Sequence, residues 1–160
     1  MRTSPCRFRL LLPLALLLFL SLLPLRAERV PMSKSELESH ATHIVVGQVT
    51  AIYRRLGAVR QGFQDTGYVA EVRVGKAEKG TGLTEGELIY VRYFTRAWVG
   101  EGDPPPDTSG YRQLPKEGER LRVYVTRAGY NGFGYTKDGG FTVVGPNGFD
   151  RENLPAPATK

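Results

Sequence analysis

Few residues of this 160-residue chain have both a type and a spacing suited to chemistry. His40 and His43 are its only histidines, and Glu36 lies four residues before His40. Two imidazoles and a carboxylate could bind zinc if one helix face carried all three. A strand is expected to begin near Thr42, which would break the helical spacing between them. We therefore favour a polar junction between a helix and a strand, and expect neither a metal nor a cofactor.

A second group is acidic. Glu101, Asp103 and Asp107 flank the proline run 104–106. A calcium loop must wrap around its ion, whereas consecutive prolines hold a chain extended, so we interpret this segment as a solvated loop. A polyproline ligand for another domain is a weaker alternative. Paired carboxylates also perform acid–base chemistry. Glu101 with Asp103, or Glu71, would serve a hydrolase, which we keep as an alternative function.

Aromatic and arginine side chains form the third group. Small β-barrels bind oligosaccharides and oligonucleotides on one face through stacking rings and basic groups. The alternative is that the rings cap the barrel ends and that the arginines form ordinary cross-strand pairs. The candidate binding residues are Arg92, Trp98, Tyr111, Arg122, Tyr130, Phe133 and Tyr135. We name no catalytic residue.

The first 27 residues have the layout of a secretory signal peptide. Three arginines precede an apolar run at 10–25, and Ala27 is a small residue at a suitable cleavage point. The apolar run has 16 residues, fewer than the roughly 20 that a membrane-spanning helix needs. We expect cleavage after Ala27, with an uncleaved membrane anchor as the alternative.

Removal of this leader changes the chemistry of the chain. Its four arginines leave 18 basic against 16 acidic residues, a net charge of +2 instead of +6. The only cysteine, Cys6, also lies in the leader. The mature domain therefore has no thiol for disulfides, catalysis or metal binding. Its near-neutral charge weakens any argument for nucleic acid as a partner.

The remaining sequence predicts a mainly β domain at 28–149 and a flexible tail at 150–160. A capping box at Ser33 and Glu36 predicts a short helix over 34–41. Side chains alternate between the two faces of a strand, which places Val45, Val49, Ala51 and Tyr53 on one face of the first strand. The expected strands are 42–53, 68–75, 88–95, 119–126 and 140–144, with 54–67 and 76–87 as turn-rich connections and a turn over 144–150.

Five strands without large helices cannot bury an apolar face as a flat sheet. We expect a five-stranded antiparallel barrel of the OB type with one short N-terminal helix. Gly47, inside the first strand, predicts a bulge or a sharp bend. The first strand is apolar on both sides, which is typical of a central strand.

Three segments carry a resemblance to known proteins: ESHATHIVVGQVTAIY, YVAEVRVGKAEKG and GELIYVRYF. They resemble small secreted bacterial proteins with an OB-like barrel and, distantly, the netrin-module and tissue-inhibitor-of-metalloproteinase group. The shared feature is a short segment ending in alanine before a V-x-G-x-V strand, here Val45 to Val49. The inhibitors insert an N-terminal cysteine into a protease, and the mature chain has none. The resemblance therefore implies a fold and no functional residue.

These observations predict a secreted or periplasmic, non-enzymatic binding module. Its expected partner is a protein or glycan of the envelope or extracellular space, with no nucleic acid. Contact with a membrane is expected only through the N-terminal segment, should residues 10–25 remain as an anchor. The binding module thus has two alternatives: the hydrolase, and a structural domain tethered to the membrane in this way.

N-terminal sequencing of the exported protein tests the leader. We expect the chain to start near Glu28, because the apolar run is short and is followed by a small residue. A start at Met1 in the membrane fraction would show that the segment is retained as an anchor.

Overall fold

The computed structural model describes residues 31–105, 111, 113–127, 140–151 and 154. One helix and six strands follow in chain order. They are α2 (Lys34–His40), β1 (His43–Arg60), β2 (Phe63–Lys79), β3 (Leu88–Trp98), β4 (Arg120–Arg127), β5 (Phe141–Val143) and β6 (Phe149–Asp150).

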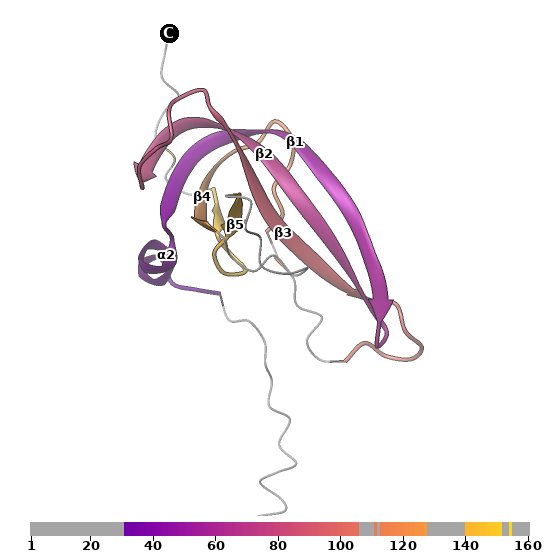
Figure 1. The fold of residues 1–160 in the computed structure, drawn as a ribbon. Coiled ribbons are helices and arrows are strands. Elements are labelled where there is room, and N and C mark those ends of the chain that lie inside the picture. Colours follow the sequence, from indigo (N-terminus) through magenta and orange to yellow (C-terminus); the bar gives the residue numbers. More distant parts are fainter. Residues whose placement is uncertain (1–30, 106–110, 112, 128–139, 152–153, 155–160) are drawn as a thin grey trace, which may run out of the picture.

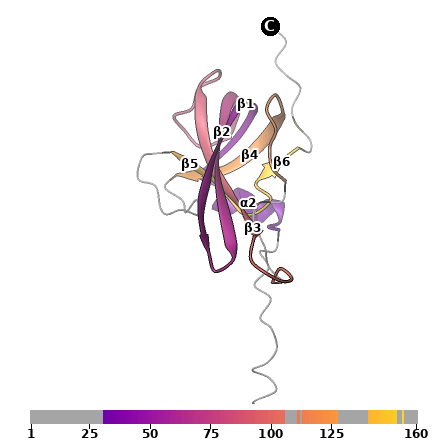
Figure 2. The same ribbon diagram turned by 90° about the vertical axis from the view of Figure 1, so that its right-hand side faces the viewer.

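Five of the strands form a closed ring (Figure 1). The pairing order is β1–β2–β3–β5–β4, and β4 returns to β1 through His43–Gln48. β5 and β6 pair with successive parts of β4, as Figure 2 shows. The expected antiparallel pairing holds everywhere except between β3 and β5, which are parallel. The sheet is therefore mixed, and the mainly β prediction with one short helix is confirmed.

The interior of the ring is filled largely by valines. Val45, Val49, Val91 and Val123 are fully buried, and they belong to one cluster with residues of every strand from β1 to β6. Full burial of such a side chain stabilises a fold by about 1.5–3 kcal/mol. Short branched side chains let the strands approach closely around a narrow core.

A second, smaller cluster lies outside the ring, under α2. Leu37 and Ala41 pack there with Ile44, Tyr124 and Val144. Ile44 belongs to β1, so this strand is apolar on both faces in its first half, as predicted. The predicted capping box is also present: Ser33 Oγ accepts from Glu36 N at 3.3 Å, and Glu36 Oε2 accepts from Ser33 N at 2.7 Å. The helix thus covers one outer side of the β1–β4 pair.

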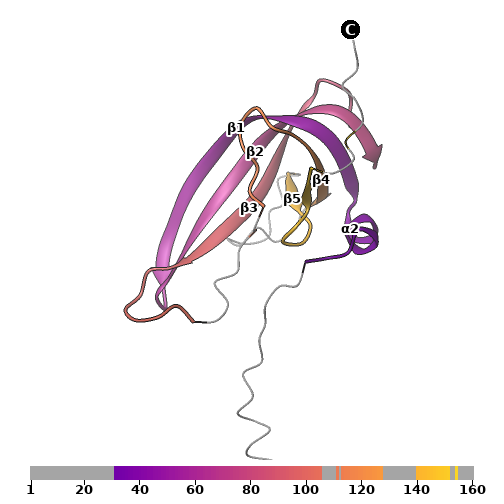
Figure 3. The ribbon, with the colours of Figure 1, turned by 180° about the vertical axis from the view of Figure 1, so that it is seen from behind.

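The β1–β2 hairpin is much longer than the sequence predicted. Residues 54–67 were expected to be a connection, but β1 continues to Arg60 and β2 begins at Phe63. Only Gln61 and Gly62 form the turn, both with positive φ (51° and 77°), as two-residue hairpin turns require. The far half of this hairpin projects beyond the ring (Figures 1 and 3). Its residues lack the buried alternation that reveals a strand.

A bulge also corrects the predicted faces of β1. The pairing with β2 shifts register between Val49 and Ala51. Ile52 consequently packs against the core, whereas Tyr53 is 54% exposed. Because side chains alternate along a strand, one extra residue exchanges the two faces beyond it.

Gly47 lies at another register shift, between Val46 and Gly47, as the sequence predicted. A Cβ at this position would overlap the carbonyl oxygen of Arg73 and would lie 2.7 Å from Val72 Cγ1. The close approach of β1 to β2 therefore requires glycine.

Replacement of this glycine tests the close approach. We expect Gly47→Ala to lower the free energy of unfolding by about 1–3 kcal/mol, because backbone atoms must move to admit the methyl group. Urea denaturation measures the change. Gly75→Ala is the matched control, since its Cβ would meet only Val46 O, at 3.3 Å. Equal stabilities of the two variants would contradict the tight contact.

Candidate functional site

An open hollow lies where the β1–β2–β3 sheet leaves the ring. Its volume is about 240 Å³. It is lined by neighbouring residues of β1, β2 and β3, and β2 is the central strand of the three. The lining residues are Tyr53, Arg54, Arg55, Gly67, Tyr68, Val69, Arg92 and Tyr93. This combination of arginines with aromatic rings makes the hollow the candidate binding site.

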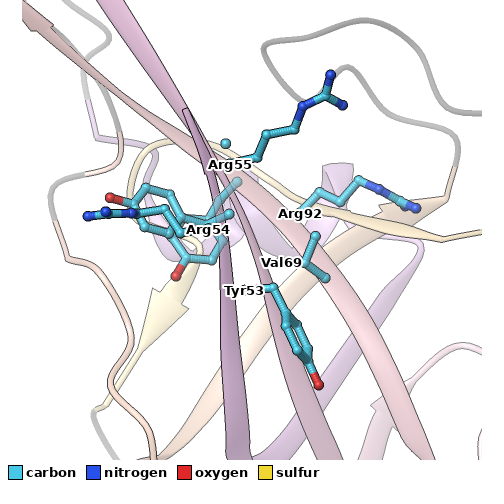
Figure 4. A pocket seen from close by; sticks show the side chains of 8 residues that line it. Tyr53, Arg54, Arg55, Val69 and Arg92 are labelled. Atoms are coloured by element: carbon cyan, nitrogen blue, oxygen red, sulfur yellow. The ribbon is translucent and has the colours of Figure 1, made fainter. Parts of the chain in front are cut away.

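Strand register explains how these residues meet. Tyr53 pairs with Val69, and Val69 pairs with Arg92; the next row is Arg54, Tyr68 and Tyr93. Successive side chains point to opposite faces of a sheet. Figure 4 accordingly shows Arg54 on the side of the sheet opposite to Arg55 and Arg92. The sheet therefore carries arginine on both faces at this height.

The rings on the inner face are ordered by packing. Tyr68 and Tyr93 stack with their centroids 5.0 Å apart and their planes 9° apart. Phe149 meets Tyr93 edge-on at 5.1 Å. Burial raises the pKa of the Tyr93 hydroxyl well above its ordinary value. Tyr93 is only 2% exposed, so its ring supports Tyr68 from within the core.

Arg54 and Arg55 are the two adjacent arginines of the hollow. Both are exposed, and within the described part of the chain neither forms an ion pair. By contrast, Arg96 pairs with Asp65 at 2.6 Å and Arg151 with Glu119 at 2.6 Å. An exposed guanidinium without a carboxylate can bind a carboxylate or a phosphate through two parallel hydrogen bonds. The hollow is consequently suited to an anion.

Of the binding residues proposed from the sequence, Arg92 lies in the hollow. It is half-buried on β3, and a Cβ on Gly140 would overlap its guanidinium group. Trp98 lies at the far end of the hairpin instead. Its ring meets Phe63 edge-on at 4.9 Å, and its Nε1 donates to the carbonyl oxygen of Gly102 at 3.2 Å. Trp98 thus closes the end of the hairpin.

Tyr111 is not a surface residue. It is only 7% exposed, belongs to the main core and donates from its hydroxyl to Val143 O at 3.2 Å. Its ring meets Tyr93 and Phe94 edge-on. The sequence prediction had named this ring as a surface candidate for stacking on a ligand.

Arg122 was expected on the outer face and is also buried. It is 7% exposed, and its Nε lies 2.7 Å from Glu78 Oε2 while its Nη1 lies 3.2 Å from Asp150 Oδ2. The predicted flexible tail therefore begins with a paired residue, Asp150, in β6. The bond from Arg122 is the main cause that lowers the pKa of Glu78. This triad joins β2, β4 and β6.

The remaining three candidates, Tyr130, Phe133 and Tyr135, lie outside the described residues. Sequence reasoning missed Tyr53, Arg54, Arg55 and Tyr68 as site residues. The adjacent arginines of β1 were a usable signal, because a strand with charge on both faces must project from the core.

The proposed acid–base residues are separated. Glu101 and Asp103 are exposed beyond the end of β3. Glu71 lies on β2, where it pairs with Tyr90, and it is eight positions from Phe63, the first residue of that strand. At about 3.3 Å per residue this is roughly 26 Å. Glu71 accepts a hydrogen bond from Thr50 Oγ1 at 2.6 Å. No aspartate or glutamate among the described residues is buried.

The histidines occupy the junction between α2 and β1. His43 is buried, with its Nε2 3.2 Å from Thr81 O and its ring edge-on to Phe141 at 5.1 Å. His40 is exposed in the last turn of α2, and the carboxylate of Glu36 is engaged by Ser33. The described residues contain no group of three metal-ligating side chains.

Comparison of the chain with protein-family models, with curated proteins and with solved structures gave no match. Within the described residues, no helix has the length and apolar character needed to cross a membrane. The leader and its predicted cleavage point lie outside those residues.

Acid titration tests the triad around Arg122. The pKa of Glu78 and that of Glu119 are lowered from 4.5, chiefly by hydrogen bonds from Arg122 and Arg151. The folded state therefore keeps these carboxylates charged at a pH where the unfolded chain takes up protons. The resulting stabilisation is complete above about pH 4.5 and is lost as the pH falls through the lowered values.

We expect urea unfolding to show a fall in stability below about pH 4.5 that is shallower in Glu78→Gln. Glu85→Gln, in the exposed turn before β3, is the control and should keep the slope of the unmodified protein. An unchanged slope in Glu78→Gln would show that the Arg122 pair contributes nothing to acid stability.

Proposed function

We propose that this protein is a secreted or envelope-associated, non-enzymatic binding module that takes an anionic ligand on the β1–β2–β3 sheet. Its binding site is the surface around the hollow, with Arg55 and Arg92 on one face of the sheet and Arg54 on the other. One observation carries the proposal: two adjacent, exposed arginines have no ion-pair partner within the described part of the chain.

The ring order supports an OB-like barrel. In such barrels β1, β2, β3, β5 and β4 close in that order, and ligands bind over strands 2 and 3 and the β1–β2 connection. The hollow is centred on β2, and the β1–β2 connection here is the projecting hairpin. The resemblance to the netrin-module group, which was based on the V-x-G-x-V strand, belongs to the same proposal.

The chemistry of the hollow favours binding over catalysis. Tyr53 is its one exposed phenol, and the charge of Glu71 raises the pKa of that group. Proton transfer near neutral pH needs groups with pKa values close to the working pH. Arginine stays charged throughout, so the lining side chains suit recognition of an anion. The hydrolase alternative would need paired acid–base carboxylates, and Glu71 lies far along β2 from the end of the sheet where Glu101 and Asp103 are exposed.

The leader supports a location outside the cytoplasm. Outside the cytoplasm, the anions available to a domain are carried by proteins and by polymers with carboxylate or phosphate groups. Nucleic acid is therefore not the expected partner. Tethering by residues 10–25 remains the alternative arrangement, and it would leave the same hollow available.

Fluorescence anisotropy with labelled polymers tests this function. We expect poly-L-glutamate and a sulfated oligosaccharide to bind the mature domain and a neutral dextran not to bind. Added salt should weaken the interaction, because exposed charges are screened. The double variant Arg54→Gln/Arg55→Gln should lose at least about tenfold in affinity, which corresponds to about 1.4 kcal/mol.

Arg73→Gln is the matched control, since Arg73 is an exposed arginine of β2 outside the hollow. Equal binding of neutral and anionic polymers would contradict the proposal. Equal losses in the control and in the double variant would show that general charge, and not the hollow, determines binding.

A further inference from the structure

The two halves of β1 differ in how their edges are used. From Ile44 to Gln48 the strand pairs with β2 on one side and with β4 on the other. From Tyr53 to Arg60 it pairs with β2 alone among the described residues. Eight residues of open edge, at about 3.3 Å each, span roughly 26 Å. Figures 1 and 3 show β1 as the outermost strand of the projecting hairpin.

The backbone groups on this edge can be assigned. Ile52 N donates to Glu117 Oε1 at 2.9 Å, so its N–H is directed away from β2. The register with β2 is regular from Ala51 to Leu56. Because alternate residues of an antiparallel strand direct their N–H groups to the same edge, Arg54 and Leu56 also present theirs outward. The chain already satisfies the first of these donors with a carboxylate.

Side chains beside this edge define what can pair with it. The segment from Ile52 to Arg60 contains three arginines and no acidic residue. Arg54 and Arg55 lie on opposite faces of the sheet. Tyr53, Leu56 and Val59 are exposed by 54%, 58% and 56%. The edge therefore combines positive charge on both faces, apolar surface and backbone donors that have no partner among the described residues.

We propose that this edge binds an extended acidic segment of a partner protein, which adds to β1 as a further strand. Main-chain hydrogen bonds supply affinity in such strand addition, and the flanking side chains supply specificity. Adjacent acidic residues in the partner would reach Arg54 on one face and Arg55 on the other. This inference names the partner class of the proposed anion site, and so it rests on the proposed function.

Charge argues against a second copy of this chain as the occupant. Two β1 edges in antiparallel contact would bring six arginines together with no acid between them. Like charges across paired strands are destabilising, and charged side chains on an edge strand oppose self-association. The same arginines attract a strand of opposite charge. The edge thus selects an acidic partner and rejects itself.

A synthetic peptide tests strand addition. Its length matches the open edge, two adjacent glutamates stand at its centre, and valine and threonine flank them. A second peptide has N-methyl groups at alternate residues, which removes backbone donors and keeps the side chains. A third has glutamines for the glutamates. Sulfated oligosaccharide is tested in parallel, with the mature domain in every case.

We expect the first peptide to bind and each modified peptide to bind at least about tenfold more weakly, because main-chain bonds and charge both contribute. Amide hydrogen exchange at Arg54 and Leu56 should slow on binding. Arg54→Gln/Arg55→Gln should lose the preference for glutamate over glutamine, whereas Arg73→Gln should keep it.

Equal binding of the first peptide and its N-methylated form would overturn strand addition and leave the anion site intact. Binding of the oligosaccharide without the peptide would overturn it in favour of a glycan. Failure of every anionic probe, poly-L-glutamate included, would overturn the proposed function as well. A complex of two protein copies in the absence of peptide would contradict the argument from charge.

Discussion

The whole structure depends on β1 being longer than the ring that it closes. Its first half pairs with both β2 and β4 and buries Val45 and Val49 inside the ring. Its second half pairs only with β2 among the described residues and carries exposed arginines. The bulge at Val49 and Ala51 separates the two parts and exchanges the faces beyond it. One strand thus joins a close-packed valine core to a projecting charged surface.

Arg122 and Arg151 differ from Arg54 and Arg55 in their partners. Near the ring, Arg122 and Arg151 are neutralised by Glu78, Asp150 and Glu119. Burying an arginine is costly unless carboxylates accept its hydrogen bonds, so these partners follow from its position. At the junction with the hairpin, Arg54 and Arg55 remain in water and need no partner for stability. Two adjacent guanidinium groups in water give this part of the surface a local capacity for anions.

Much of the ring could be predicted from sequence, because strands that face a core carry valines at every second position, and this alternation is visible in the sequence. The capping box of α2 and the special role of Gly47 were also visible as local patterns. The parallel β3–β5 contact and the far half of the hairpin were not. Long-range pairing leaves no local trace, and a strand exposed on both faces has no apolar alternation. Tyr111 and Arg122 were assigned to the surface because exposed rings and arginines are the groups with which such barrels bind ligands. The structure instead buries the ring of Tyr111 and pairs Arg122 with two acids.

Amide hydrogen exchange of the free protein tests the central feature, the open edge of β1, most directly. Amides from Ile44 to Gln48 should all exchange slowly, since both edges are paired there. Beyond Ile52 the account predicts alternation: slow exchange at Tyr53 and Arg55, whose N–H groups face β2, and fast exchange at Arg54 and Leu56. Slow exchange at Arg54 and Leu56 in the free protein would show that the edge is already covered, and would contradict the account.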